Sequence, residues 1–358
     1  MVQVVEASVS VAQQVNARLD DLDWAQADLA NVLGWSVQSV SELVKGRRRI
    51  DGGTAMELAA ALGGDPRDWL VLQADHDIWI ASHDAQLRVA LNKIDERAKI
   101  ERVLPVRELV RRGRFPKGDV AAQHEAACEL LEVPDLTQPP SFPVVARRAN
   151  HRDRVGRQQR AWVACAREAA RQGTVGRYSA KRLSDLGASL SRIIQGPQDF
   201  IGLPSEFASA GVRLVHVEPF PGGRIDGVST IVDGTPVIAL SGRGGRMDKV
   251  LYTLAHEAAH VAQGHLQRAQ LFVSSEDDGG DVGLERAADR IAAQWLVPDL
   301  EGLRHGLVTG QRVEDLARHL GISEAVIIGR LQKERLIPWN SLLNRRIPSV
   351  KEAMRMWS

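Results

Sequence analysis

The sequence predicts a mainly α-helical protein with one small β-sheet, in the α+β class. Apolar residues recur at helical spacing through most of the chain, and alternation with a period of two is confined to residues 212–240. Glycines stand at the ends of several of the helical runs. A chain of 358 residues is too long for one ordinary hydrophobic core, so we expect several domains.

We divide the chain into four parts. A compact helical module covers residues 1–82, and a helical connecting region covers residues 83–200. A region with a short sheet and a metal-binding pattern covers residues 201–300, and a C-terminal helical subdomain covers residues 301–358. The best linker candidate is the stretch 135–143, which holds three prolines.

The composition excludes several classes of protein. The net charge is +1, so the overall balance indicates neither a nucleic-acid nor a membrane partner, and any such partner must be inferred from local charge. Cys128 and Cys165 are the only cysteines, which excludes a cysteine zinc cluster and a disulfide framework. No run approaches 18 apolar residues and no signal segment begins the chain, so we predict a cytoplasmic protein without a membrane span.

The first module has the pattern of a helix-turn-helix. A short helix over residues 26–33 ends at Gly34, and Ser36 caps the next helix, which runs to Lys45 and stops at Gly46. The expected inward positions of that helix are Val37, Val40, Leu43 and Val44. Further helices are predicted over residues 11–19, 54–62 and 66–80.

Polar and basic residues lie where this arrangement would meet DNA. Side chains on the first turns of the second helix of a helix-turn-helix reach base edges, and basic residues at its far end suit phosphates. The alternative is a solvated face of a helical bundle used for protein contacts. The candidates for DNA contact are Gln26, Ser36, Gln38, Ser39, Ser41, Lys45, Arg47 and Arg48, with Arg49 next in line.

The stretch "AQADLANVLGWSVQSVSELVKGRRRI" and the later segment Trp69–Gln73 resemble the Xre-type DNA-binding domain, and more narrowly the HigA-type antitoxins. The resemblance covers about residues 10–82. It implies a homodimer that binds double-stranded DNA at a palindromic operator, and it leaves a toxin partner open.

The connecting region is rich in arginine. These arginines can lie on DNA beside the helix-turn-helix module, or they can belong to solvated helix faces and salt bridges, which we favour. The arginines concerned are Arg107, Arg111, Arg112, Arg114, Arg147, Arg148, Arg152, Arg154, Arg157 and Arg160.

From Gly211 the periodicity changes to two. Residues 212–217 read as a strand, and residues 227–232 and 236–240 read as a hairpin around Asp233 and Gly234. A helix then runs from Met247 or Asp248 to about Gly264.

That helix carries the pattern His-Glu-x-x-His. His256 and His260 lie one turn apart on one face, the spacing that two imidazole ligands of a Zn²⁺ ion need. Glu257 is offset from that face, where it can hold a water molecule and take its proton.

A catalytic zinc also needs a third protein ligand. Gln263 and Leu266 occupy the positions where a metzincin has a glycine and a third histidine, so that pattern fails. We choose Glu285 because a rigid helix places a ligand better than the loop expected around residues 276–281. Asp289, one turn on, can bond a ligating histidine and set its tautomer. The alternative for Glu285 and Asp289 is that they are exposed acidic residues near a helix N-terminus, where negative charge suits the helix dipole.

The segments "YTLAHEAAHVAQGH" and "LERAADRIAAQWLVP" resemble the ImmA/IrrE family of metallopeptidases. The resemblance covers about residues 200–300 and implies a zincin-like fold. Position by position it implies the zinc ligands His256, His260 and Glu285 and the catalytic carboxylate Glu257. His265 falls where members often have a histidine, which either stabilises an oxyanion or caps the helix, and we favour the cap. Tyr252 is a weaker candidate.

Residues 313–336 also have helix-turn-helix form, with Gly321 at the turn and Ser323 as a cap. They can be a second DNA reader or helices that close the preceding domain. We favour the structural role, because Ile322, Val326, Ile327 and Leu331 look like packing residues.

Three functions fit these patterns. The first is a DNA-binding regulator fused to a zinc endopeptidase that cleaves a repressor-type protein, itself or a partner. The second is a transcription factor whose peptidase-like domain senses metal or a ligand without cleaving. The third is an antitoxin-like regulator that binds a toxin. The sequence predicts the same metal ligands for the first two.

Overall fold

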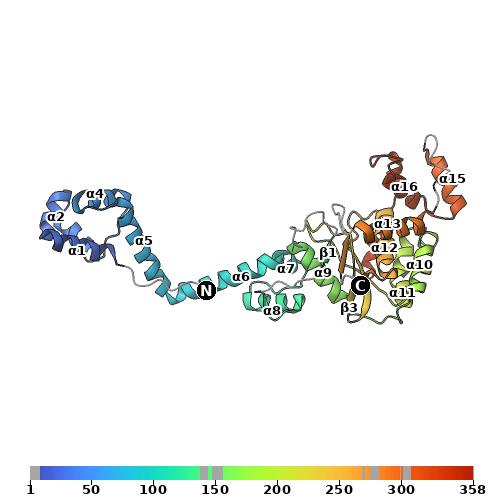
Figure 1. Cartoon of the computed structure of the whole chain (residues 1–358), viewed down its shortest axis with the longest axis horizontal. Coiled ribbons are helices and arrows are strands. Elements are labelled where there is room, and N and C mark those ends of the chain that lie inside the picture. The colour runs from blue at the N-terminus through green and yellow to red at the C-terminus, as the bar shows by residue number, and fades with distance from the viewer. Residues whose placement is uncertain are drawn as a thin grey trace. The chain divides into compact units, whose positions relative to one another are not determined.

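The computed structural model describes residues 9–137, 144–146, 156–267, 271–274, 282–298, 300 and 308–357. The chain divides into two compact units, residues 1–97 and 98–358, which we describe separately (Figure 1). Within the described ranges no helix has both the length and the apolar character needed to cross a bilayer.

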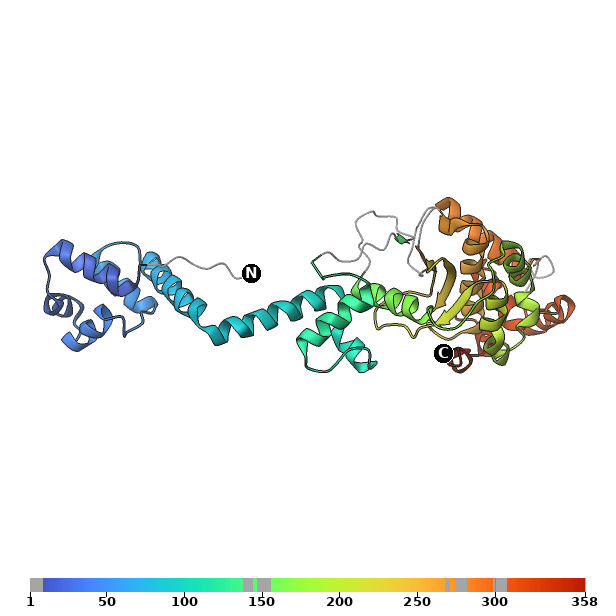
Figure 2. The same ribbon diagram turned by 90° about the horizontal axis from the view of Figure 1, so that it is seen from below.

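The described residues of the first unit form helices joined by short turns and loops (Figure 2). Its core holds Val15, Leu29, Val40, Leu58 and Trp69, which are all buried. The division between the two units falls within α6 (Ala85–Val103). The preceding helices are α1 (Val11–Leu22), α2 (Gln26–Leu33), α3 (Val37–Val44), α4 (Gly52–Leu62) and α5 (Pro66–His83).

The turn between α2 and α3 forms as the sequence predicts. Gly34 ends α2 in the left-handed conformation with φ 69°, which a glycine adopts without steric cost. The Ser36 hydroxyl accepts the Ser39 N–H at 3.1 Å and caps α3. The inward position expected for Val37 is wrong, because this residue is 55% exposed. The first turn of α3 extends beyond the core, and Ser36 and Gln38 are exposed beside it.

The second unit is built on a five-stranded sheet with the order β1-β5-β3-β4-β2. β3 and β4 form an antiparallel hairpin, and Asp233 and Gly234 make its turn with φ of 49° and 77°. β2 joins β4 in parallel, and β1 joins β5 in parallel. The strands are β1 (Val144–Ala146), β2 (Arg213–His216), β3 (Gly227–Val232), β4 (Thr235–Leu240) and β5 (Leu271–Ser274).

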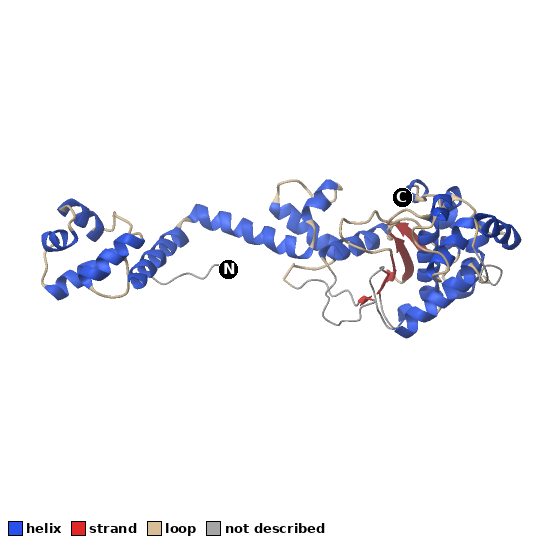
Figure 3. Ribbon diagram, turned by 90° about the horizontal axis from the view of Figure 1, so that it is seen from above, coloured by secondary structure: helices blue, strands red, loops and turns tan. Residues whose placement is uncertain are grey.

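Helices cover both faces of this sheet (Figure 3). Leu214, Ile238 and Leu240 pack with α10 (Ala180–Ile193), α11 (Leu203–Ser209) and α12 (Met247–Ala262). Val228 and Ala239 face the other way, toward α7 (Val106–Arg111), α8 (Val120–Leu131) and α9 (Arg157–Ala169). α10, which lies in the predicted connecting region, therefore shares a core with α12, the helix that carries the metal-binding pattern.

The C-terminal helices also belong to this core. Ile327, Ile328 and Leu331 of α16 (Glu324–Lys333) are fully buried there, and Ile322 and Val326 are nearly so. The structure thus supports the packing role that we favoured for residues 313–336. The remaining elements are α13 (Val282–Leu296), α15 (Gly310–Leu320), α16 (Glu324–Lys333), α17 (Lys351–Arg355) and the 3₁₀ turns η1 (Pro197–Gly202), η2 (His265–Gln267) and η3 (Leu342–Arg346).

The predicted fold class is confirmed. The three predicted strands and the predicted metal-site helix are present within a few residues of their expected ends. β1 and β5 were not predicted, because a three- or four-residue strand has little periodicity of its own and is defined by pairing with a distant segment. Much of the linker candidate and the expected loop at residues 276–281 lie outside the described residues. So do all four arginines between residues 147 and 154, which are Arg147, Arg148, Arg152 and Arg154.

Candidate functional site

The candidate metal centre is built on α12, most of whose residues are buried. It packs against β3 and β4 on one side and against α10, α13 and α16 on others. His256 is 3% exposed, and Glu257 and His260 are fully buried. Polar side chains this deep need hydrogen-bonding or metal partners, because burying them alone is costly.

Three of these polar side chains converge. The Nε2 atoms of His256 and His260 lie 3.0 Å apart. Glu285 comes from α13, which packs beside α12, and its carboxylate oxygens lie 3.1 Å from His256 Nε2 and 3.4 Å from His260 Nε2. One nitrogen or oxygen of each residue lies within 4.8 Å of the others, the arrangement of a possible metal site.

This donor set fits a zinc ion. Zn²⁺ takes His nitrogen and carboxylate oxygen ligands at about 2.0–2.2 Å, so neighbouring ligands of a tetrahedral site lie about 3.3 Å apart. The three donor–donor distances of 3.0–3.4 Å are close to that value. Two histidines and one glutamate are also the ligand set of catalytic zinc sites that keep one position open.

Glu257 lies beside the start of β3. A Cβ atom built on Gly227 would lie 3.2 Å from both Cγ and Oε1 of Glu257, and 2.7 Å from Cγ2 of Thr253. The strand approaches α12 this closely because Gly227 has no side chain. Sequence reasoning missed Gly227, although a glycine opening a strand is a signal of close backbone approach.

A hydrogen-bonded group holds His256 from behind. Asp289 Oδ1 lies 2.9 Å from His256 Nδ1, as the sequence analysis expected for a residue that sets the tautomer. The Tyr252 hydroxyl donates to the same oxygen at 2.8 Å, so this tyrosine helps to hold the carboxylate that supports His256. Lys333 of α16 approaches Asp289 at 3.4 Å and lies over the Tyr252 ring. Lys333 was missed because it is 77 residues from His256 and joins it only through the fold.

His260 has a corresponding neighbour in His265. The two Nδ1 atoms are 2.9 Å apart, and His265 is buried. Only one of the two nitrogens can carry the proton of this bond, so His265 is placed to set the tautomer of His260. This contact adds a third role to the helix cap and the oxyanion contact that were considered for His265 from the sequence.

The electrostatics of the group favour a cation. Burial alone would lower the pKa of His256, but hydrogen bonds to Asp289 and Glu285 outweigh it and raise the pKa to about 9. Burial opposes ionisation of Glu285, yet hydrogen bonds from His256 and His260 lower its pKa to about 2. The pKa of Asp289 is also held well below its usual range, against burial, by His256 and Lys333. The ionised carboxylates thus surround a position that a divalent cation can take in place of a proton.

The candidate DNA-contact residues of the first unit lie along α2, α3 and the turn after α3. Ser36 and Gln38 are exposed, while Gln26, Ser39 and Ser41 are half-buried. Ser36 and Ser39 hydroxyls are 2.9 Å apart, so both are partly committed to the cap. Lys45, Arg47 and Arg48 are exposed at the far end of α3.

Two further residues support that basic end. The Arg48 guanidinium lies 4.5 Å from the centre of the Trp35 ring, and Arg49 forms an ion pair with Asp77 of α5. Sequence reasoning did not single out either partner. Lys45 and Arg47 are exposed and make no such contact with any residue that the structure describes.

Five of the six described arginines named for the connecting region are engaged within the second unit, and Arg107 is exposed. Arg111 and Arg112 bind Glu108, Arg114 binds Glu168, and Arg157 binds Glu101. Arg160 donates to the Val103 carbonyl at 2.9 Å. These contacts favour salt bridges over the DNA role considered for them.

Comparison with known proteins agrees with both sites. Residues 16–69 match the helix-turn-helix family model, and residues 209–332 match the peptidase M78 model, described as the IrrE N-terminal-like domain. No curated protein matches the chain. One solved structure, a putative antidote protein of a plasmid maintenance system from Nostoc punctiforme, is 36% identical over 24% of this chain and 94% of that chain, with a TM-score of 0.22.

The fold and the two matches define a class, a DNA-binding regulator fused to a peptidase-like domain. Within that class the chain joins an N-terminal domain of the Xre-like helix-turn-helix type to a domain of the ImmA/IrrE metallopeptidase type. The resemblance predicted from the sequence motifs is confirmed.

Proposed function

We propose that this chain is a cytoplasmic transcription regulator whose second unit is a zinc-dependent endopeptidase, with a repressor-type protein as its substrate. The convergence of His256, His260 and Glu285 beside Glu257 is the observation that carries the proposal. Bound by these three residues, Zn²⁺ would supply Lewis-acid chemistry at a peptide carbonyl.

The protein's own residues do the rest. Glu257 accepts a proton from the attacking water and passes it to the leaving amine. Asp289 and His265 hold the Nδ1 sides of His256 and His260, so that both Nε2 atoms face the metal position. Tyr252 and Lys333 hold Asp289 in turn.

The test compares cleavage with metal content. The full chain is incubated with Zn²⁺ and with candidate repressor proteins of its host, and mass spectrometry searches for a new terminus. We expect Glu257→Gln to bind one Zn²⁺ per chain and to lose cleavage by a factor of at least 100. The exposed Glu206→Gln is the matched control and should cleave normally. Cleavage by Glu257→Gln at the rate of the unmodified chain would contradict the role of Glu257 in the mechanism.

We further propose that the first unit binds a palindromic operator as a homodimer. Gln38 would contact a base edge, and Lys45, Arg47 and Arg48 would contact phosphates. Gln38→Ala should then lower affinity for the operator and little else, whereas Arg47→Ala should weaken binding to all sequences and reduce the salt dependence by about one charge. Footprinting and titrations at several salt concentrations measure both.

A second candidate function, sensing without cleavage, is favoured by one observation. A cavity of about 510 Å³ lies beside α12 and is lined by Tyr252, His256 and Lys333 together with apolar residues such as Leu296 and Val326. A small molecule there can reach the residues that hold Asp289. If this reading is correct, no protein is cleaved, and addition of Zn²⁺ changes operator affinity equally in the native chain and in Glu257→Gln.

A further inference from the structure

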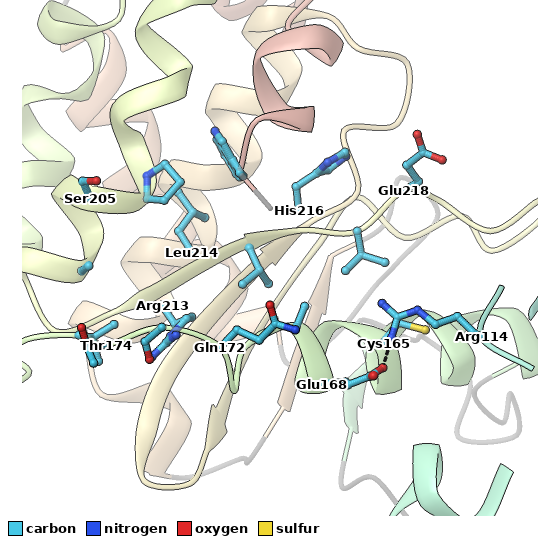
Figure 4. Close-up of a pocket in the computed structure, with 18 of the residues that line it drawn as sticks. Arg114, Cys165, Glu168, Gln172, Thr174, Ser205, Arg213, Leu214, His216 and Glu218 are labelled. Atoms are coloured by element: carbon cyan, nitrogen blue, oxygen red, sulfur yellow. Dashed lines mark hydrogen bonds and ion pairs between the residues drawn. The ribbon is translucent and has the colours of Figure 1, made fainter. Parts of the chain in front are cut away.

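A second large cavity runs along β2 (Figure 4). This strand forms one edge of the sheet, and β1 forms the other edge. It is a groove of about 910 Å³, and none of its lining residues belongs to the metal centre. All four residues of β2 line it. The strand is the floor of the groove over its whole length.

β2 is an edge strand with one side unpaired. It is bonded to β4 on the other side, and the N–H of Val217 at its end donates to the Leu240 carbonyl at 3.1 Å. Because N–H groups alternate in direction along a strand, those of Leu214 and His216 point away from β4. Among the residues that the structure describes, none makes a backbone hydrogen bond to these outward groups. Such an edge is a template for one more strand.

Helices stand on both sides of this edge. Cys165 and Glu168 of α9 line one wall, and Pro204, Ser205 and Ala208 of α11 line the other. The edge is therefore recessed between two helices. Two copies of the chain would each present a recessed edge, which keeps their β2 strands from meeting, whereas a single extended segment can lie along the floor.

The positive charge of Arg213 at one end of the groove indicates that the bound segment carries an acidic side chain. The Arg213 guanidinium donates to the Gly173 carbonyl at 2.8 Å. Its Nε is buried without a hydrogen-bond partner, and Arg213 forms no ion pair with a carboxylate of the described part of the chain. At the other end Arg114 is already paired with Glu168 (Figure 4). An acidic side chain of the occupant would meet the Arg213 charge.

We propose that this groove docks an extended segment of a partner protein, which adds to β2 as a sixth strand and places an aspartate or glutamate on Arg213. Backbone hydrogen bonds to Leu214 and His216 supply affinity, and the acidic side chain supplies selectivity. The site acts independently of the metal, so it does not rest on the proposed peptidase function.

The test uses short peptides with the full-length chain. The probe is a fluorescein-labelled octapeptide of alternating valine and glutamate, acetylated and amidated so that only side chains carry charge. Octapeptides of valine with glutamine and of valine with lysine are its matched controls. Fluorescence anisotropy gives the Kd of each, and hydrogen–deuterium exchange reports on residues 213–217. The glutamate peptide should bind at least tenfold more tightly than the glutamine peptide and should slow exchange over this segment.

Two variations separate the side-chain contact from the backbone contact. Arg213→Gln should reduce the preference for glutamate to less than about threefold, while the exposed Arg192→Gln should leave it unchanged. N-methylation of alternate amides of the peptide should abolish binding in one of the two possible sets only, because only one set faces β2. Native melting behaviour of Arg213→Gln shows that its fold is intact, and the N-methyl peptides test the proposal even if that variant does not fold.

Several outcomes would overturn the proposal. These are equal affinity for the three peptides, glutamate binding that Arg213→Gln leaves unchanged, and exchange over residues 213–217 that the peptide does not slow. Protection of the same residues that rises with the concentration of the full-length chain, without peptide, would assign the groove to a second copy instead.

Discussion

At the scale of single residues, each ligating imidazole of the metal centre is oriented by the group behind it. Asp289 accepts a hydrogen bond from Nδ1 of His256, and it is itself bonded by Tyr252 and Lys333. Second-layer hydrogen bonds of this kind fix the tautomer and the ring orientation of a metal-bound histidine. The metal affinity should therefore depend on residues that do not touch the ion.

Replacement of Asp289 tests this dependence. Asp289→Asn keeps the shape but removes the charge, and we expect the affinity for Zn²⁺ to fall about 10- to 100-fold. Tyr252→Phe removes one hydrogen bond to Asp289 and should cost less than that. Competition with a chromophoric chelator measures each Kd, and the exposed Asp315→Asn serves as the control. Unchanged affinity in Asp289→Asn would show that Asp289 has no part in the site.

The two cysteines should differ in reactivity. Burial raises the pKa of the Cys165 thiol to about 11, so at pH 8 only about one molecule in a thousand carries the reactive thiolate. Cys128 is half-buried. We expect iodoacetamide at pH 8 to modify Cys128 at least tenfold faster, as followed by peptide mass mapping.

The same shift has a consequence for stability. The folded chain holds the Cys165 proton more tightly than the unfolded chain, whose thiol has a pKa of about 8.5. The contribution of this thiol to the free energy of unfolding is therefore complete below about pH 8.5 and declines as the pH rises toward 11.

Urea provides the control for the alkylation experiment. In urea both cysteines should react with iodoacetamide at similar rates, and a difference in rate that persists there would contradict burial as the cause.

At the scale of elements, small residues determine how closely the helices and strands of the site approach. Gly227 and Ser229 of β3 face α12, and both are buried. Gly187 of α10 plays the same part against α13, where a Cβ atom would lie 2.4 Å from Cζ3 of Trp295. The position of Glu285 on α13 thus depends on the contact of α13 with α10 as well as on its contact with α12.

Gly187→Ala measures the importance of this approach. Alanine in a helix usually stabilises by up to about 1 kcal/mol relative to glycine. Here the new methyl group must displace the Trp295 ring, and overpacking of this kind costs about 1–3 kcal/mol. We expect the free energy of unfolding to fall and the melting temperature to drop. Gly202→Ala, with nothing within 4 Å and φ −79°, is the matched control and should not destabilise. A stabilised Gly187→Ala would contradict the packing.

At the scale of the whole molecule, each unit has its own hydrophobic core. The core of the first unit draws on residues 11–72, and the two clusters of the second draw on residues 100–357. A unit with its own core can fold alone. DNA binding and metal binding should therefore separate when the chain is cut.

Fragments 1–84 and 85–358 test this independence, since the cut falls between α5 and α6. We expect calorimetry of the full chain to show the two transitions of the separate fragments. Only fragment 85–358 should bind Zn²⁺, and only fragment 1–84 should retard operator DNA. Absence of a cooperative transition in fragment 85–358 would show that its core depends on the first unit.

Local patterns in the sequence were enough to predict the helix-turn-helix, the hairpin at Asp233 and Gly234, and the two histidines on one helix face. Each of these depends on residues a few positions apart, and for such features spacing alone defines geometry. The choice of Glu285 over the acids of residues 276–281 also followed from sequence, because a helix is a more rigid support than a loop.

Only the tertiary structure placed Lys333 and His265 behind the ligands, paired β1 with β5, and left the edge of β2 open between α9 and α11. These features join segments that are distant in the chain or depend on the direction of one side chain. The spacing of neighbouring apolar and polar residues predicts neither a contact between distant segments nor the direction of a single side chain. The sequence by itself therefore determined the class of site and its primary residues, and packing decided what supports that site and which surfaces remain for partners.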